Sequence, residues 1–201
     1  MADRTVAFLP ASAGPRRGRG GVFLRFRRAQ EGSAAIEFAF VGVPFLMMLW
    51  AIFETALMFW TTQVLEESLS QASRSILTGE SRSLYKGTAA ANATAFRDAI
   101  CAEAPLGLID CSKLAIDVRP YASFNDASAG TAASNPIAGG MLDLRGFGYA
   151  QPTGDQIVVV RAVLDYPLFL TGWASKGLAN IGAGHRAIVA STAFRTEPFL
   201  P

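Results

Sequence analysis

Residues 25–38 read RFRRAQEGSAAIEF, and within this stretch a basic segment gives way to a long apolar run. No charged residue lies between Phe38 and Phe53, and over Phe38–Met58 the only charge is Glu54. An α-helix needs about 20 mainly apolar residues to cross the hydrocarbon core of a bilayer. The sequence therefore predicts a single transmembrane helix, which we assign to residues 33–60.

Four residues of this segment refine the prediction. Glu37 falls near one end of the span, and Glu54 lies about 25 Å further along a helix that rises ~1.5 Å per residue. A charge at the bilayer centre costs about 2.5–3.5 kcal/mol on insertion scales, and neither glutamate is placed there. Trp60 suits the aromatic belt at the exit interface. Pro44 removes one helical hydrogen bond, so we expect a local kink rather than a break.

Charge predicts the orientation. Residues 1–32 contain seven arginines and two acidic residues, a net charge of +5, whereas the whole chain carries only +2. The positive flank of a membrane helix stays in the cytoplasm, so residues 61–201 are expected on the other side, in the periplasm of a bacterium. The basic balance is local to residues 1–32, of which 1–21 are expected to be disordered. Nucleic-acid binding is not expected.

The apolar run is too long for the core of an ordinary secretory signal, and small residues precede it instead of following it. This arrangement resembles a class III, prepilin-type signal. In that family a membrane peptidase cuts after a glycine, here Gly32, and leaves the apolar helix on the mature protein. Ser33 would then be the first residue, Glu37 the fifth, and Phe38 the aromatic residue after it.

The resemblance is closer still to the TadE-like proteins of tight-adherence (Flp-type) pilus systems. Those proteins open with a basic segment, then a glycine, small residues, an aliphatic residue, Glu-Phe, and an apolar helix with an early proline and a late glutamate. Residues 65–74 (LEESLSQASR) resemble the family's helix after the membrane, and residues 195–198 (RTEP) resemble its closing stretch. The matching positions are Gly32, Ile36, Glu37, Phe38, Pro44 and Glu54. A leader of 32 residues is long for the family, and major pilins often have tyrosine where Phe38 stands.

The resemblance implies a role for Glu37. In pilin-like filaments the fifth-position carboxylate is thought to pair with the free α-amino group of a neighbouring subunit, which Ser33 would carry here. Opposite charges attract strongly in a low dielectric, so pairing would offset the cost of burial. The alternative is that Glu37 extends to the cytoplasmic headgroups. The implied partners are the inner membrane, the prepilin peptidase, other pilin-like subunits and pilus assembly proteins.

Residues 61–201 are expected to form an α+β domain. Residues 61–77 continue the helix in amphipathic form, and a second helix is predicted at 89–102. Residues 113–118, 156–164 and 186–194 have the β-branched, alternating character of strands, whereas 124–154 are expected to form long loops and one short strand. The predicted fold is pilin-like: a transmembrane helix continuing into an amphipathic helix that packs on an antiparallel sheet of three or four strands. The apolar positions of the amphipathic helix are Leu65, Leu69, Ala72 and Ile76.

The two cysteines, Cys101 and Cys111, both fall in the predicted exported part. An oxidising compartment permits a disulfide between them, and closing so short a loop would contribute about 2–3 kcal/mol in the chain-entropy model. The alternative is a pair of buried thiols. With one histidine and no CxxC pattern, a metal site is not expected.

Sequence motifs of catalysis are absent: there is no GxSxG, HExxH, Walker loop or GxGxxG pattern. His185, the sole histidine, lies beside a glycine-rich turn at a predicted strand start. We therefore expect no enzyme and no cofactor. Two interpretations stay open, namely a processed pilin-like component of a pilus system, or an uncleaved single-pass protein whose periplasmic domain binds a ligand or partner. An exported enzyme would need an acid or base that no motif supplies.

Overall fold

The computed structural model describes residues 32–169, 177–182 and 184–199. They fall into two compact units divided between Met48 and Leu49. The predicted leader and its disorder lie almost wholly outside the described residues. The elements in chain order are α2 (Ser33–Leu77), α3 (Ser81–Leu84), α4 (Ala89–Glu103), η2 (Pro105–Gly107), η3 (Cys111–Lys113), β1 (Leu114–Tyr121), α5 (Phe124–Ala133), β2 (Ile137–Ala138), β3 (Met141–Leu142), β4 (Ile157–Pro167) and β5 (His185–Arg195).

Helix α2 is the longest element, 45 residues from Ser33 to Leu77, and it continues without a break through Pro44. Its first part, in the first unit, exposes nearly all of its apolar side chains. Its later part packs against the sheet of the second unit through the predicted stripe. Leu65, Leu69 and Ile76 are at most 1% exposed, and Ala72 is also buried. The predicted amphipathic helix at 61–77 is therefore confirmed.

The sheet has three antiparallel strands in the order β1-β4-β5, as the α+β prediction requires. The central strand β4 is buried on both faces along almost its whole length, which explains its nearly continuous β-branched sequence. All three predicted strands are present, each extended by a few residues. A separate hairpin of β2 and β3 forms a two-stranded sheet.

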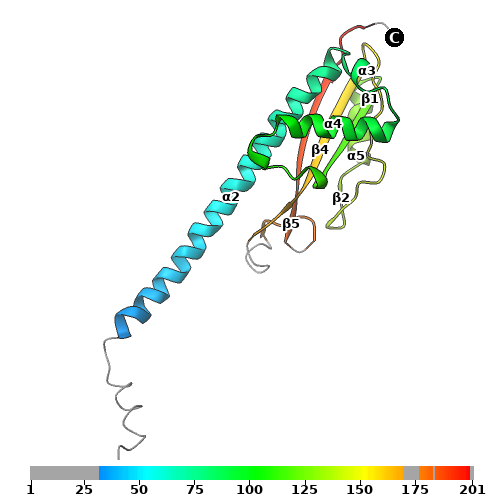
Figure 1. The fold of residues 1–201 in the computed structure, drawn as a ribbon. Helices are drawn as coiled ribbons and strands as arrows, with labels where there is room; N and C mark the ends of the chain where they lie inside the picture. Colours follow the sequence, from blue (N-terminus) through cyan, green and yellow to red (C-terminus); the bar gives the residue numbers. More distant parts are fainter. Residues whose placement is uncertain (1–31, 170–176, 183, 200–201) are drawn as a thin grey trace, which may run out of the picture. The chain divides into compact units, whose positions relative to one another are not determined.

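Each face of the sheet has its own cover (Figure 1). One face, carrying Val158, Val160 and Ala162 of β4, joins α2 and α4 in the main hydrophobic core. On the other face α5 covers Ile157 and Val159. Figure 1 accordingly shows α4 in front of the strands and α5 behind them. The fold thus has a three-layer arrangement over part of the sheet.

The prediction of loops with one short strand over residues 124–154 is wrong for Phe124–Ala133, which is the helix α5, whereas residues 134–154 are mainly loop around the short β2–β3 hairpin. Ser123 caps it: the Ser123 hydroxyl accepts a hydrogen bond from the Asp126 amide at 3.2 Å and donates one to the Asp126 carboxylate at 2.7 Å. Serine followed three residues later by a carboxylate is a helix-start pattern close to the capping box. The alanines after it favour helix, so local propensity outweighed the glycine and serine content.

Candidate functional site

Gly32, the predicted cleavage position, is the first residue that the structure describes. Gly32 is exposed, and a Cβ added to it would meet no atom within 4 Å among the described residues. Helix α2 begins at the next residue, Ser33. Glu37 and Phe38, the fifth and sixth positions counted from Ser33, are both exposed, Phe38 by 77%. The residues that the prepilin resemblance singles out therefore lie at the surface of the first unit.

The apolar part of α2 is long enough and hydrophobic enough to cross a membrane, judged by length and composition. Large apolar side chains along it are exposed: Phe40 by 77%, Phe45 by 54% and Trp50 by 58%. In water such a surface would be strongly unfavourable, because burying apolar area is the main force that holds a soluble fold together. A lipid or protein environment around this segment removes that cost.

Glu54 is buried although it lies within the apolar run, with only 3% of the residue exposed. Its carboxylate accepts a hydrogen bond from the Phe169 backbone N–H at 2.5 Å, just after β4 ends. A buried charge is costly unless hydrogen bonds satisfy it. The loop that follows β4 thus supplies part of the compensation for this acidic residue on the helix, and the sequence alone gave no sign of this contact.

A second contact joins the far end of α2 to the C-terminal segment. The backbone N–H of Glu197 donates to the Leu77 carbonyl at 3.0 Å. Beside it Thr196, 2% exposed, donates to the Thr153 carbonyl and accepts from the Gln156 amide. The RTEP stretch therefore has a structural role: it closes the sheet onto the end of α2. Glu54 and Leu77 fix the helix to the head at two points about 34 Å apart along the helix axis, at ~1.5 Å per residue.

Cys101 and Cys111 form a disulfide, with their Cα atoms 6.2 Å apart. It joins the last turns of α4 to the short helix η3 that leads into β1. Both cysteines of the chain are used, so there is no free thiol. The predicted disulfide is supported, and the alternative of two buried thiols is not.

The one buried ion pair of the described residues lies in the sheet, and the sequence analysis missed it. Arg161 on β4 donates to Asp117 on β1 at 2.6 Å, and the two side chains are 4% and 2% exposed. Arg161 also donates to the carbonyl and hydroxyl of Ser134, at the end of α5. Asp117 further accepts from Arg119 at 2.9 Å and from the Gly148 amide at 3.3 Å. This network fixes α5 and the loop at 146–148 to the sheet.

His185 lies at the start of β5, as predicted, and its Nδ1 is 2.7 Å from the Asp165 carboxylate. Both side chains are partly exposed, by 41% and 31%. Among the described residues no group of three or more His, Cys, Asp or Glu side chains could hold a metal ion. The contact links Asp165 of β4 to His185 of β5, its neighbour in the sheet.

Comparison with known proteins gives one result. The family model described as TadE-like protein matches residues 32–74. No curated protein and no solved structure matches the chain significantly. The matched segment starts at Gly32 and covers the apolar helix together with most of its amphipathic continuation. It suggests a membrane protein associated with a tight-adherence pilus system. Residues 32–74 are therefore similar to the TadE-like family.

Proposed function

We propose that this protein is a minor pilin-like (pseudopilin) component of a tight-adherence, Flp-type pilus assembly or secretion system. In this role a prepilin peptidase cuts it after Gly32, the helix from Ser33 crosses the bacterial inner membrane, and the head lies in the periplasm. The protein binds partners and catalyses no reaction. The observation that carries the proposal is the TadE-like match, which begins at the residue where cleavage is expected and contains Glu37.

The exposed helix of the first unit supports this role. A lone transmembrane anchor needs only apolar residues, yet Glu37 lies exposed four residues after the proposed new N-terminus. A carboxylate in a membrane is costly unless it is paired. The free α-amino group that cleavage would create on Ser33 of a neighbouring subunit offers such a partner. Cleavage and assembly are thereby linked, because an uncut chain has no amine at this position.

The head supports the role in a different way. It packs on α2 through a hydrophobic core, and a disulfide and hydrogen bonds at Glu54 and Leu77 strengthen the structure. Because the core packing and these two hydrogen bonds join the later part of α2 to the head, the two would enter an assembly as one body. That property suits a subunit of an assembly machine.

Complementation tests the proposal. In a strain that lacks this gene, Gly32→Leu should leave the chain uncut and abolish surface pili, measured as major pilin in the sheared fraction. Glu37→Gln should be cut but should still reduce pili strongly. Gly42→Ala is the matched control, because a Cβ at Gly42 meets only ordinary contacts with Phe38, and it should restore pili fully.

Two results would contradict the proposal. One is normal piliation in the strain without the gene. The other is full complementation by Gly32→Leu, which would favour the alternative of an uncleaved single-pass protein with a binding domain in the periplasm.

A further inference from the structure

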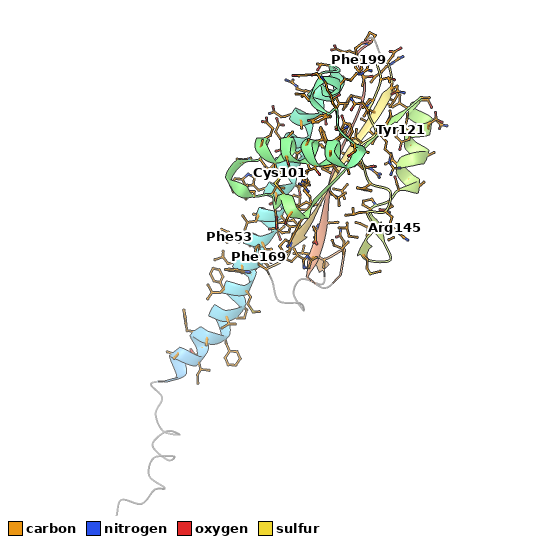
Figure 2. The ribbon with its side chains drawn as sticks, turned by 45° about the vertical axis from the view of Figure 1, so that its right-hand side comes forward. Phe53, Cys101, Tyr121, Arg145, Phe169 and Phe199 are labelled. Carbon is orange, nitrogen blue, oxygen red and sulfur yellow. A yellow bond between two sulfur atoms is a disulfide. The ribbon has the colours of Figure 1, made fainter. Side chains whose placement is uncertain are left out.

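The hydrogen bond between Glu54 and Phe169 holds the segment just after β4 beside Glu54 of α2. Phe169 lies just after the end of β4, and its side chain is 66% exposed. Phe53, the neighbour of Glu54 on the helix, is 63% exposed. Figure 2 labels Phe53 on α2 and Phe169 beyond the end of β4, and the hydrogen bond from Phe169 to Glu54, the neighbour of Phe53, joins the two segments. Two exposed aromatic residues thus accompany a part-buried hydrogen bond.

Phe169 is held in this position from several sides. Its backbone N–H is bonded to Glu54, and the preceding Leu168 donates to the Gly184 carbonyl at 2.8 Å and packs against the main core. The Phe169 ring makes an edge-on contact with Tyr166, with centroids 6.5 Å apart. Tyr166 itself is buried. The backbone and one side of the ring are therefore anchored, while the rest of the ring faces outward.

The length of the apolar part of α2 determines how deep Glu54 and Phe169 lie in a membrane. Twenty residues counted from Ala34 end at Phe53, and at ~1.5 Å per residue they span about 30 Å, the thickness of the hydrocarbon core. Glu54 and Phe169 then fall at the boundary between hydrocarbon and headgroups. Exposed apolar residues of α2 continue for less than two turns, to Trp60, before Gln63, Glu66 and Glu67 take over the exposed positions.

We propose that Phe169 is a membrane-contacting residue of the head, which inserts beside Phe53 into the boundary layer of the bilayer that α2 crosses. The head would then be seated on the lipid surface. Aromatic side chains favour this layer, and the carboxyl group of the buried Glu54 accepts the Phe169 backbone N–H there. This inference rests on the membrane-spanning part of the proposed function and does not depend on cleavage or on pili.

The exposed phenylalanine of α5 provides a matched control. Phe124 is 63% exposed, nearly the same as Phe169, but it lies at the start of α5 on the other face of the sheet. Any general tendency of an exposed ring to bind lipid would appear equally at both positions.

The test uses the full chain in phosphatidylcholine and phosphatidylglycerol vesicles. Cysteine is introduced at one position at a time, as Phe45→Cys, Phe169→Cys or Phe124→Cys, and labelled with bimane. The native cysteines are joined in a disulfide, so only the new thiol reacts. Lipids with a nitroxide at a shallow or a deep acyl position then quench the label according to its depth.

We expect the label at position 169 to lose fluorescence mainly with the shallow nitroxide, and the label at 45 mainly with the deep one. The label at 124 should keep its fluorescence with both. If 169 behaves like 124 while 45 is quenched, the head does not touch the bilayer and the inference is overturned, although the span stands. If 45 is not quenched either, the membrane span itself is wrong and the inference fails with it.

A second measurement needs no substitution. A lipid carrying a photoactivated diazirine in its acyl chain is incorporated with the unmodified protein, and mass spectrometry maps the adducts. The account expects adducts at Phe53 and Phe169 and none at Phe124. Adducts confined to α2 would overturn the inference independently of any effect of the cysteine variants on folding.

Discussion

Asp117 is a single carboxylate on which three parts of the head depend, through Arg161, Arg119 and the Gly148 amide. Removing one partner of a buried ion pair leaves the other charge uncompensated and costs about 3–5 kcal/mol. We therefore expect Asp117→Asn to cause a clear decrease in the midpoint temperature of unfolding. The measurement is thermal unfolding of the full chain in detergent.

The control for Asp117 is Arg145→Ala, which removes an exposed arginine from its pair with Asp143. Exposed ion pairs contribute little, so this variant should unfold near the wild-type temperature. Equal effects of the two substitutions would show that the buried network does not stabilise the head in the way described.

Gly154 is a position where only the smallest residue fits. A Cβ there would come within 2.4 Å of the Phe199 carbonyl oxygen and 2.7 Å of its nitrogen, which are backbone atoms. Overpacking of this kind costs about 1–3 kcal/mol, because the backbone must shift. Gly154→Ala should thus destabilise the head in the same unfolding assay, whereas Gly148→Ala, where the space is open, should not. Equal unfolding midpoints for the two variants would show that the close approach of the Phe199 backbone to Gly154 does not limit the residue at this position.

Tyr149 gives the head a dependence on alkaline pH. Burial raises the pKa of its phenol from 10.0 to about 12, outweighing the opposite effect of Ser81. The folded state therefore holds this proton more tightly than the unfolded state. The resulting stability is fully present below pH 10 and is lost as the pH rises from about 10 to about 12.

The measurement is the unfolding midpoint of wild type and Tyr149→Phe across that pH range. The variant lacks the ionisable group, so its stability should fall less steeply between pH 10 and 12. If the unfolding midpoints of the two proteins fall in parallel as the pH rises, ionisation of Tyr149 is not the cause of the loss of stability at alkaline pH.

At the scale of elements, the long apolar run, the amphipathic stripe and the three strands could be predicted from the sequence. Each of these has a periodic or β-branched pattern that local physics dictates. The glycine, serine and asparagine content around α5 predicts loop, whereas the cap from Ser123 to Asp126 favours the start of a helix. The contacts of Glu54 with Phe169 and of Asp117 with Arg161 could not be predicted, since they join residues that only the completed fold brings together. Arg161 within an apolar strand was the one available sign of such a partner.

The disulfide belongs to this scale because it joins the end of α4 to the start of β1. Replacing both cysteines by alanine should lower the free energy of unfolding by about 2–3 kcal/mol, as expected for a loop this short. A reducing agent should lower the free energy of unfolding of the wild type by a similar amount and should leave that of the double variant unchanged. A wild type that does not respond to reduction would show that the disulfide does not contribute to stability.

At the scale of the whole molecule, the TadE-like segment carries the apolar helix and the candidate processing site, and the head fixes the far part of that helix. The predicted orientation and cleavage both follow from residues 1–38, of which only 32–38 are described by the structure. The sequence therefore predicts the membrane location and orientation of the protein, and the described residues test only part of that prediction. The structure in turn adds the head's contacts with α2, which no motif contains.

The N-terminal residue of the mature protein tests the central claim most directly. The protein is extracted from membranes of cells with and without the prepilin peptidase, and its N-terminus is read by Edman degradation or mass spectrometry. We predict that the chain starts at Ser33 when the peptidase is present and retains residues 1–32 when it is absent. Retention of residues 1–32 in both strains would contradict it.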